Sequence, residues 1–410
     1  MRRIAIILLM MILSNSVSAQ WVHTTLGDSN WVDCFAVSGP NLFAGPGDSG
    51  IYLSTDNGIN WRAVDSGLTD PGVQSLYANG ANLFAGTHDS GVYLSTNEGA
   101  SWSQVDSGLF GYLTDQVFAF AVSGTNLFAG TGYGIYLSSN NGTSWSMTGF
   151  PHTFVRAFAV LNTNLFAVTN DGPFPDVYLS TDSGTNWMQS SYSTNPTPTS
   201  ALALIGTNLF AGGLLGVFRS TDSGSNWVPV SSGLPYGDLP SEVTALAISG
   251  TNLFAGTDSG IYLSTDNGAN WTSENRGLTD STDFSYALAV NGRYIFAGTT
   301  ATGVWRRPLS DFGISAVGQN AAAGNFAAPL AAPNPASDAT TISFSTSSDS
   351  YLKIEVFDVL GNKISSGFEG TLAGGNHAVP ISLQGLESGV YYAQIITSEG
   401  GPQTLKLVKE

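Results

Sequence analysis

The chain has 410 residues and a formal net charge of −17 at pH 7, with 10% charged and 11% aromatic side chains. Few charges and many aromatic residues exclude an intrinsically disordered chain. A protein this acidic repels the phosphate backbone of nucleic acids, which we do not expect as partners. The single cysteine, Cys34, excludes an intrachain disulfide, and its apolar neighbours predict a small core residue.

The first 19 residues have the organisation of a secretory signal peptide. Arginines at positions 2 and 3 precede an apolar run over residues 4–13, and small residues lead up to Ala19. This pattern predicts cleavage between Ala19 and Gln20. The apolar run is too short to cross a bilayer. We expect the mature chain to begin at Gln20 and to be exported as a soluble protein.

An eight-residue phrase, Ser-x-Asp-x-Gly-x-x-Trp, occurs six times, and its tryptophans recur every 40 to 44 residues. The first copy runs from Ser54 to Trp61. The third position is an aspartate in four copies and an asparagine in two: Asp56, Asn97, Asn140, Asp182, Asp222 and Asp266. A period of this length is typical of four-stranded propeller blades.

Three strand-like strings precede the phrase in each repeat. The first is small and apolar, as in residues 117–122; the second is Asn-Leu-Phe-Ala-Gly or a variant; the third is Gly-Ile/Val-Tyr-Leu-Ser, as in residues 260–264. The tryptophan of the phrase opens a fourth, more polar strand. Short runs rich in β-branched and aromatic residues, bounded by Gly, Asn, Asp and Ser, predict strands. We therefore predict an all-β fold.

The ends of the repeat region complement each other. The second string occurs seven times but the phrase only six, because the last repeat stops at Arg307 without a fourth strand. Residues 21–27 align with a fourth strand that lacks its own first three. We predict that they complete the last repeat, which gives a seven-bladed β-propeller over residues 20–310, closed by the N-terminal strand. An open solenoid is the alternative, but it would need capping units.

The phrase resembles the Asp box of bacterial sialidases and related propellers, and the resemblance covers residues 20–310. It implies a turn between the third and fourth strands of each blade. An Asp or Asn side chain can accept backbone N–H bonds there, glycine takes an unusual φ, and tryptophan packs between blades. We interpret the six third-position residues as structural. A residue repeated in every blade serves a need of every blade, whereas one catalytic site needs one copy.

Sialidases, which share the Asp box, use an arginine triad, a Tyr–Glu pair and an aspartate acid/base. Recognition of a carboxylate through two parallel bonds requires the fork of arginine. Among the arginines of residues 20–310, only Arg156 falls in a first strand near the axis, and the Arg-Ile-Pro motif of sialidases is absent. Sialidase activity is therefore disfavoured.

Two sets of loops, between strands four and one and between strands two and three, share one face of a propeller. Where they depart from the repeat, they place aromatic groups beside carboxylates, which suits binding of a sugar or a peptide. We select as ligand-binding candidates Trp31, His88, Tyr112, Tyr133, His152, Arg156, Asp171, Asp176, Tyr236 and Asp238. Ordinary loop variation is the alternative, and most loop aspartates are interpreted as turn formers. The sequence predicts no catalytic residue, no metal site and no cofactor.

The composition changes after Arg307. Residues 311–332 are rich in Ala, Gly and Pro and predict a linker. Residues 333–410 contain, in order, Asn-Pro, Leu-Gly-Asn, Gly-Val-Tyr and Lys-Leu-Val-Lys elements. They resemble the C-terminal sorting domain of the type IX secretion system. Residues 379–381, Val-Pro-Ile, depart from the usual Trp-Asp, which leaves the strand there in question.

The resemblance of the tail implies an Ig-like β-sandwich and, as a partner, the type IX secretion machinery. It also implies passage across the outer membrane, followed by release or by attachment to the outer-membrane surface. An accessory sandwich that binds glycans is the alternative.

Three functions remain open. The preferred one is a secreted or surface-displayed monomer whose propeller binds a glycan or an extracellular protein through its loop face, without catalysis. The second is a glycoside hydrolase or lyase with two loop carboxylates. The third is a structural or adhesion component of the cell envelope. The near-identity of the blades favours a binding protein over an enzyme.

Overall fold

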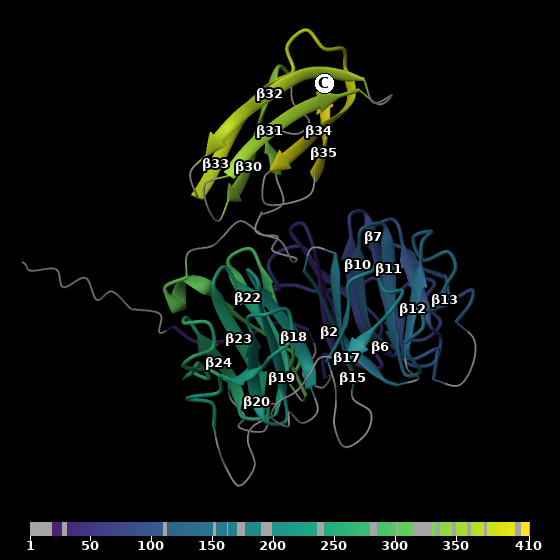
Figure 1. Cartoon of the computed structure of the whole chain (residues 1–410), viewed down its shortest axis with the longest axis vertical. Coiled ribbons are helices and arrows are strands. Elements are labelled where there is room, and N and C mark those ends of the chain that lie inside the picture. Colours follow the sequence, from purple (N-terminus) through teal and green to yellow (C-terminus); the bar gives the residue numbers. More distant parts are fainter. Residues whose placement is uncertain are drawn as a thin grey trace, which may run out of the picture.

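The computed structural model of the chain consists almost entirely of antiparallel β-sheets (Figure 1). The structure describes residues 19–26, 31–109, 113–150, 153–161, 163–169, 177–189, 199–235, 242–278, 285–300, 302–314, 330–332, 337–346, 350–358, 362–372, 375–397 and 403–409. Among these residues, no helix has the length and apolar character needed to span a membrane.

Seven four-stranded sheets lie among the described residues between Val22 and Pro308. Their first strands are β2 (Cys34–Ser38), β6 (Val73–Asn79), β10 (Val117–Ser123), β14 (Val155–Leu161), β18 (Thr199–Ile205), β22 (Val243–Ser249) and β26 (Ser285–Asn291). Their second strands are β3 (Asn41–Gly45), β7 (Asn82–Thr87), β11 (Asn126–Thr131), β15 (Asn164–Thr169), β19 (Asn208–Gly213), β23 (Asn252–Thr257) and β27 (Tyr294–Thr299).

The third and fourth strands complete each sheet. The third strands are β4 (Tyr52–Ser54), β8 (Val92–Ser95), β12 (Ile135–Ser138), β16 (Val177–Ser180), β20 (Gly216–Ser220), β24 (Gly260–Ser264) and β28 (Val304–Pro308). The fourth strands are β5 (Arg62–Ala63), β9 (Ser103–Gln104), β13 (Ser146–Met147), β17 (Met188–Gln189), β21 (Val228–Pro229), β25 (Thr272–Ser273) and, at the N-terminal end, β1 (Val22–His23).

The sheets form a closed ring. Each first strand contacts the first strand of the next sheet, and β26 contacts β2, so that no sheet is left at an end. The last sheet has the order β1-β28-β27-β26, with Val22 opposite Arg306 and His23 opposite Trp305. This pairing confirms that the N-terminal strand supplies the missing fourth strand of the last repeat.

The second strands are the most deeply buried part of the ring. The Leu, Phe and Ala of each Asn-Leu-Phe-Ala-Gly string are buried, and Phe43, Phe84 and Phe128 are fully so. Burial of one such side chain contributes roughly 1.5–3 kcal/mol relative to leaving it in water. Because the string recurs in every sheet, the same interior is built seven times, and this explains why the sequence varies so little there.

Neighbouring sheets are joined through the recurring turns. The phrase glycine has a positive φ, +85° at Gly142 and +82° at Gly184, which other residues rarely adopt. A Cβ added to Gly142 would lie 2.7 Å from the ring of Phe84, and one added to Gly184 would lie 2.3 Å from the ring of Phe128. Both phenylalanines belong to the preceding sheet. The glycine therefore serves the turn and the contact between sheets.

The phrase tryptophans also bridge sheets. The indole N–H of Trp102 donates to the Val64 carbonyl 2.6 Å away, and that of Trp145 donates to the Val105 carbonyl at 2.7 Å. In each pair the carbonyl belongs to the preceding sheet. Trp21 makes the equivalent bond where the ring closes: its indole N–H donates to the Glu274 carbonyl at 2.7 Å.

The ring extends beyond the predicted boundary at residue 310. A short 3-10 helix, η1 (Leu309–Phe312), follows β28, and both Leu309 and Ile314 are buried beside Trp21 and Phe254. These apolar side chains extend the core of the ring to Ile314, into the linker predicted over residues 311–332.

The C-terminal part is built from two sheets around one core. One sheet contains β29 (Leu330–Ala332), β30 (Ala339–Thr346) and β33 (Gly375–Ser382). The other contains β31 (Ser350–Phe357), β32 (Lys363–Leu372), β34 (Gly389–Thr397) and β35 (Gln403–Lys409). Ile342 and Ile381 of the first sheet pack with Leu352 and Ile395 of the second. This arrangement is a β-sandwich; its immunoglobulin-like character stays a prediction.

Two details of the sandwich differ from the sequence analysis. Strand β29 pairs with β30, so the domain begins at Leu330, within the predicted linker. The Val-Pro-Ile segment that left its strand in question lies in β33, where Ile381 is 1% exposed. Apolar residues on the inner side of the sheet suffice to keep this strand in place.

Candidate functional site

A β-bulge near the start of six first strands sets the geometry of the candidate site. The pairing register shifts between Val73 and Ser75, and in the same way in β10, β14, β18, β22 and β26. Such a bulge leaves one residue unpaired and turns its side chain away from the regular alternation of the strand. In β2 the corresponding residue is Asp33, which directly precedes Cys34, the partner of Gly45.

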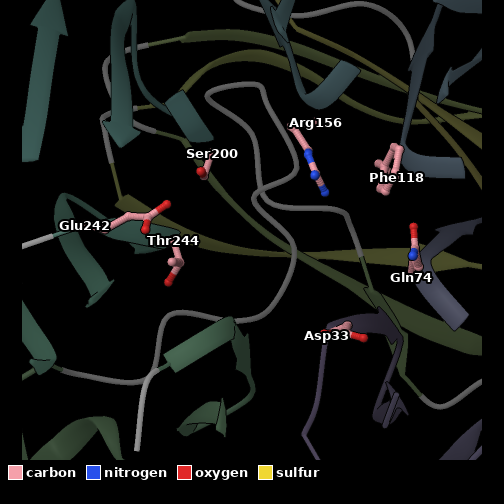
Figure 2. Close-up of a pocket in the computed structure, with 7 residues that line it drawn as sticks. All are labelled: Asp33, Gln74, Phe118, Arg156, Ser200, Glu242 and Thr244. Carbon is pink, nitrogen blue, oxygen red and sulfur yellow. The ribbon is translucent and has the colours of Figure 1, made fainter. Parts of the chain in front are cut away.

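The bulge residues differ in every sheet, although the rest of the repeat hardly changes. They are Asp33, Gln74, Phe118, Arg156, Ser200, Thr244 and Tyr286. The first six line one pocket of about 420 Å³ together with Glu242. Figure 2 shows these side chains around a common space at the axis of the ring. We call this space the axial pocket.

The axial pocket lies at the end of the ring where the first strands begin. In these antiparallel sheets, Val117 at the start of β10 faces Thr131 at the end of β11, while Leu127 faces Ser138 at the opposite end. The loops between strands two and three therefore border the pocket, and the recurring turns after Ser138 and its equivalents lie at the far end. The aspartates of the phrase cannot reach the pocket.

Arg156 presents a cation to the axial pocket. Its guanidinium carbon lies 4.3 Å from the centre of the Phe118 ring, and the centre of the Phe154 ring lies 6.0 Å from that of Phe118. Loss of solvent around the guanidinium lowers the pKa of Arg156. It forms no ion pair with any carboxylate that the structure describes. An arginine whose guanidinium carbon lies over an aromatic ring can still donate its N–H groups to an anion.

Asp33 is a carboxylic acid of the pocket with a raised pKa. Burial raises the pKa of its carboxyl from 3.8 to about 6; a hydrogen bond from the Trp31 side chain opposes this rise, and the negative charge of Asp48 adds to it. The Trp31 indole covers Gly47, where an added Cβ would lie 2.4 Å from the ring nitrogen. The glycine thus allows the indole to lie close to the loop beside Asp33.

Gln74 adds an unsatisfied acceptor. Its side-chain oxygen Oε1 is buried and has no hydrogen-bond partner in the part of the chain that the structure describes. A buried polar oxygen without a partner costs roughly 1–3 kcal/mol. A bound donor would remove this cost, so Gln74 is suited to receive an N–H or O–H group.

Two predicted candidates lie on the loops around the pocket without lining it. His88 Nδ1 is 2.9 Å from Asp89 Oδ1, and both side chains are largely exposed. The backbone N–H groups of Gly72 and Asp89 donate to Asp70, each at 2.9 Å. This is the turn-forming role expected of loop aspartates. Tyr133 is 38% exposed on the loop after β11.

Of the remaining candidates, Arg156 lines the pocket and Trp31 lies beside it, bonded to Asp33. Six lie outside the described residues: Tyr112, His152, Asp171, Asp176, Tyr236 and Asp238. The sequence analysis did not select Asp33, Gln74, Phe118, Ser200 or Thr244. The available signal was the second residue of each first strand, or in β2 the residue just before the strand, where the repeat is least regular.

The six recurring turns share one set of hydrogen bonds. In the fourth repeat, Asp182 Oδ1 accepts the backbone N–H of Asn186 at 2.8 Å, and Ser180 Oγ accepts that of Gly184 at 2.8 Å. The backbone N–H and side-chain amide of Asn186 and the hydroxyl of Ser180 all donate to the Asp182 carboxyl and lower its pKa. The aspartate therefore holds the turn in its ionised form.

No metal centre emerges from the described residues, since no group of three or more His, Cys, Asp or Glu side chains among them could hold an ion.

Comparison with solved structures identifies the ring as a β-propeller. The chain is 17% identical to YCF48 bound to a D1 peptide, covering 70% of this chain and 97% of that one, with a TM-score of 0.57. It is 16% identical to the GH74 xyloglucanase of Xanthomonas campestris, covering 94% and 69%, with a TM-score of 0.59. The extracellular domain of BT4673 from B. thetaiotaomicron gives 12% identity, 96% and 59% coverage, and a TM-score of 0.57.

The C-terminal part is a secretion sorting domain. Residues 331–410 match the family described as the secretion system C-terminal sorting domain. Such a domain implies contact with the type IX secretion machinery and export to the cell surface or beyond. No curated protein matches the chain in sequence.

Proposed function

We propose that the propeller is the exported part of the protein and binds an extracellular ligand, a glycan or a protein, in the axial pocket without catalysis. Residues 1–19 would start export as a signal peptide, and the sorting domain would complete it. The mature protein would act as a monomer outside the cell or on the outer-membrane surface.

One observation carries this proposal. The bulge residues at the axis differ from sheet to sheet, while the strands and turns around them repeat almost unchanged. A closed ring needs no particular side chain at these positions, so their diversity favours a recognition surface. A cavity of about 420 Å³ is within the range of small-ligand and peptide sites.

The fold is compatible with either ligand class. The YCF48 structure holds a D1 peptide, and the GH74 relative is a xyloglucanase. Both are under 25% identical to this chain. They show that the fold can accommodate either kind of ligand, but they do not indicate which ligand this chain binds. The recurring turns also have the hydrogen bonds expected of Asp boxes, which supports that resemblance.

The test is a binding screen of the full-length mature chain on glycan and peptide arrays, with turnover assays on every ligand found. We expect binding without turnover. Ser200→Trp, which fills the pocket, should abolish binding. Ser146→Trp, on the exposed fourth strand β13, is the matched control and should bind normally. Ligands retained by the Ser200 variant would place binding elsewhere and refute the proposal.

Glycoside hydrolysis is the second candidate, because Asp33 has the raised pKa of a general acid and Glu242 lines the same pocket. In that case, Asp33→Asn would lower turnover of a bound oligosaccharide by at least 100-fold, the size of a typical general-acid contribution. Loss of turnover in this variant would show that the propeller is an enzyme and would refute binding without catalysis.

A further inference from the structure

We propose that the axial pocket recognises a peptide segment through a single carboxylate, which Arg156 binds, while Gln74 and Asp33 accept N–H groups of the same segment. The inference rests on the proposed binding function and names its ligand class.

A second arginine of the same ring shows what Arg156 lacks. Arg307 stacks on Phe312 at 4.2 Å, much as Arg156 stacks on Phe118 at 4.3 Å. Arg307 is also paired with two carboxylates, at 3.0 Å from Glu274 and 3.4 Å from Asp311. The stacked arginine that holds the structure together is thus neutralised within the chain.

Arg156 has the same stack and no carboxylate partner among the described residues. Its ring support fixes the plane of the guanidinium, and its N–H edge faces the pocket in Figure 2. A carboxylate matches this edge with two parallel hydrogen bonds. We therefore assign the missing partner to the ligand.

The acceptors of the pocket define the rest of the ligand. Gln74 Oε1 is buried and has no partner among the described residues, and Asp33 offers carboxyl oxygens in the same pocket. Both call for hydrogen-bond donors. A peptide carries backbone N–H groups close to its terminal or side-chain carboxylate, and so supplies both kinds of group at once.

An acidic polysaccharide fits less well. Sugars commonly stack on an open aromatic face, but the Phe118 ring has Arg156 over it and Phe154 beside it. Asp33 and Glu242 line the pocket, and the whole chain carries a net charge of −17, so a chain of repeated carboxylates is repelled. A single carboxylate avoids this repulsion because Arg156 compensates it.

The experiment uses the full-length mature protein and an array of decapeptides in four forms: free or amidated C-termini, each with acidic side chains present or replaced by amides. Fluorescence anisotropy then measures the affinity of each hit. Removing the recognised carboxylate should weaken binding by roughly 10–100-fold, the range of a charge-assisted hydrogen-bond pair. The form that loses affinity identifies a terminal or a side-chain carboxylate as the source.

Variants test the assigned partner. Arg156→Gln should bind the free acid as weakly as wild type binds its amide, and Arg156→Lys should recover part of the affinity. Arg62→Gln, on the exposed fourth strand β5, is the matched control and should not change it. Unfolding midpoints and circular dichroism confirm that each variant is folded.

Each remaining outcome refutes a different statement. Binding that is blocked by Ser200→Trp but unchanged by Arg156→Gln and by amidation would support binding in the axial pocket. It would refute recognition of a carboxylate by Arg156. Binding that Ser200→Trp does not block would refute both. Binding of oligogalacturonate with no peptide binding, or no binding to any peptide, would refute the peptide class.

Discussion

The third and seventh positions of the recurring phrase are matched as hydrogen-bond partners. Where the third residue is Asp222, the seventh is Asn226, whose amide donates to the carboxylate at 2.7 Å. Where the third residue is Asn140, the seventh is Ser144, whose hydroxyl accepts from the amide at 2.8 Å. An acceptor is thus paired with a donor, and a donor with an acceptor. The two positions act as one unit.

We predict that this pairing contributes to the free energy of unfolding. Asp222→Asn should destabilise the protein by about 1 kcal/mol, because the new amide faces the Asn226 amide and one hydrogen bond is lost. Adding Asn226→Ser should restore most of the stability, since the pair then matches that of Asn140 and Ser144. Urea denaturation of the single and double variants measures both steps. Equal stability of the two variants would contradict the coupling.

Asp33 gives the protein a pH-dependent stability. Its pKa rises from 3.8 in the unfolded chain to about 6 in the fold, so folding favours the protonated carboxyl. This contribution is complete below pH 3.8 and is lost as the pH rises through about 6. The folded protein therefore retains a strained carboxylate at neutral pH, as binding and catalytic sites often do.

Asp33→Asn should remove this pH dependence. The variant should be more stable than wild type by roughly 1–2 kcal/mol at pH 7.5, less than the full shift implies because the carboxyl is partly exposed. The difference should shrink towards zero at pH 4. Unfolding midpoints of both proteins between pH 4 and 8 provide the measurement, and a difference that is constant with pH would exclude Asp33 as the group responsible.

At the scale of the element, β1 decides whether the ring is closed. The strand has only two residues, but Trp21 before it is 1% exposed and bonded to the Glu274 carbonyl. The Trp61 indole N–H donates to Thr24 Oγ1 at 3.1 Å, and Arg306 Nη1 donates to the Asn57 carbonyl at 2.7 Å. Side chains from both ends of the ring therefore hold the junction together.

Trp21→Ala should cost about 3–5 kcal/mol, the usual penalty for truncating a fully buried tryptophan. Trp61→Ala removes the hydrogen bond to Thr24 across the same junction, and its loss should cost less because Trp61 is only partly buried. Deleting residues 19–26 should expose the edge of β28 and cause association between chains. Thermal unfolding and size-exclusion chromatography give the two readouts; a monomeric, stable deletion variant would argue against closure by β1.

The repeat explains which elements could be predicted. The repeat period and the strand-like strings predict an all-β fold. The second string occurs seven times and the phrase only six, which predicts the closing strand, and the pairing of Val22 with Arg306 confirms it. The domain limits stay predictions: Ile314 packs into the core of the ring, and Leu330 pairs with Ser343 of β30. Local composition around them, rich in small residues, carries no sign of those contacts.

The whole molecule joins a β-propeller to a secretion sorting domain. Each has its own apolar core, one centred on the ring and one on the sandwich. The buried residues of the sorting domain come from β30, β31, β33, β34 and β35 and from Leu383, all within this domain. The two domains can therefore be separated by deletion.

Removing residues 330–410 should leave a folded propeller that accumulates in the periplasm instead of reaching the cell surface. Cell fractionation and protease accessibility of intact cells measure its location. A chain lacking only residues 318–327 is the control and should be delivered normally. Surface delivery of the truncated protein would contradict the sorting function of residues 331–410.

The sequence by itself determined the β-sheet repeat, the closing strand and the sorting domain, because each depends on short patterns repeated or ordered along the chain. It also indicated Arg156 as the arginine near the axis. Only the tertiary structure brought Asp33, Gln74 and Phe118 to the same pocket as Arg156. These residues are about 40 residues apart and share no motif. Bulges in β6, β10 and β14 set the positions of Gln74, Phe118 and Arg156, and closure of the ring makes them neighbours of Asp33.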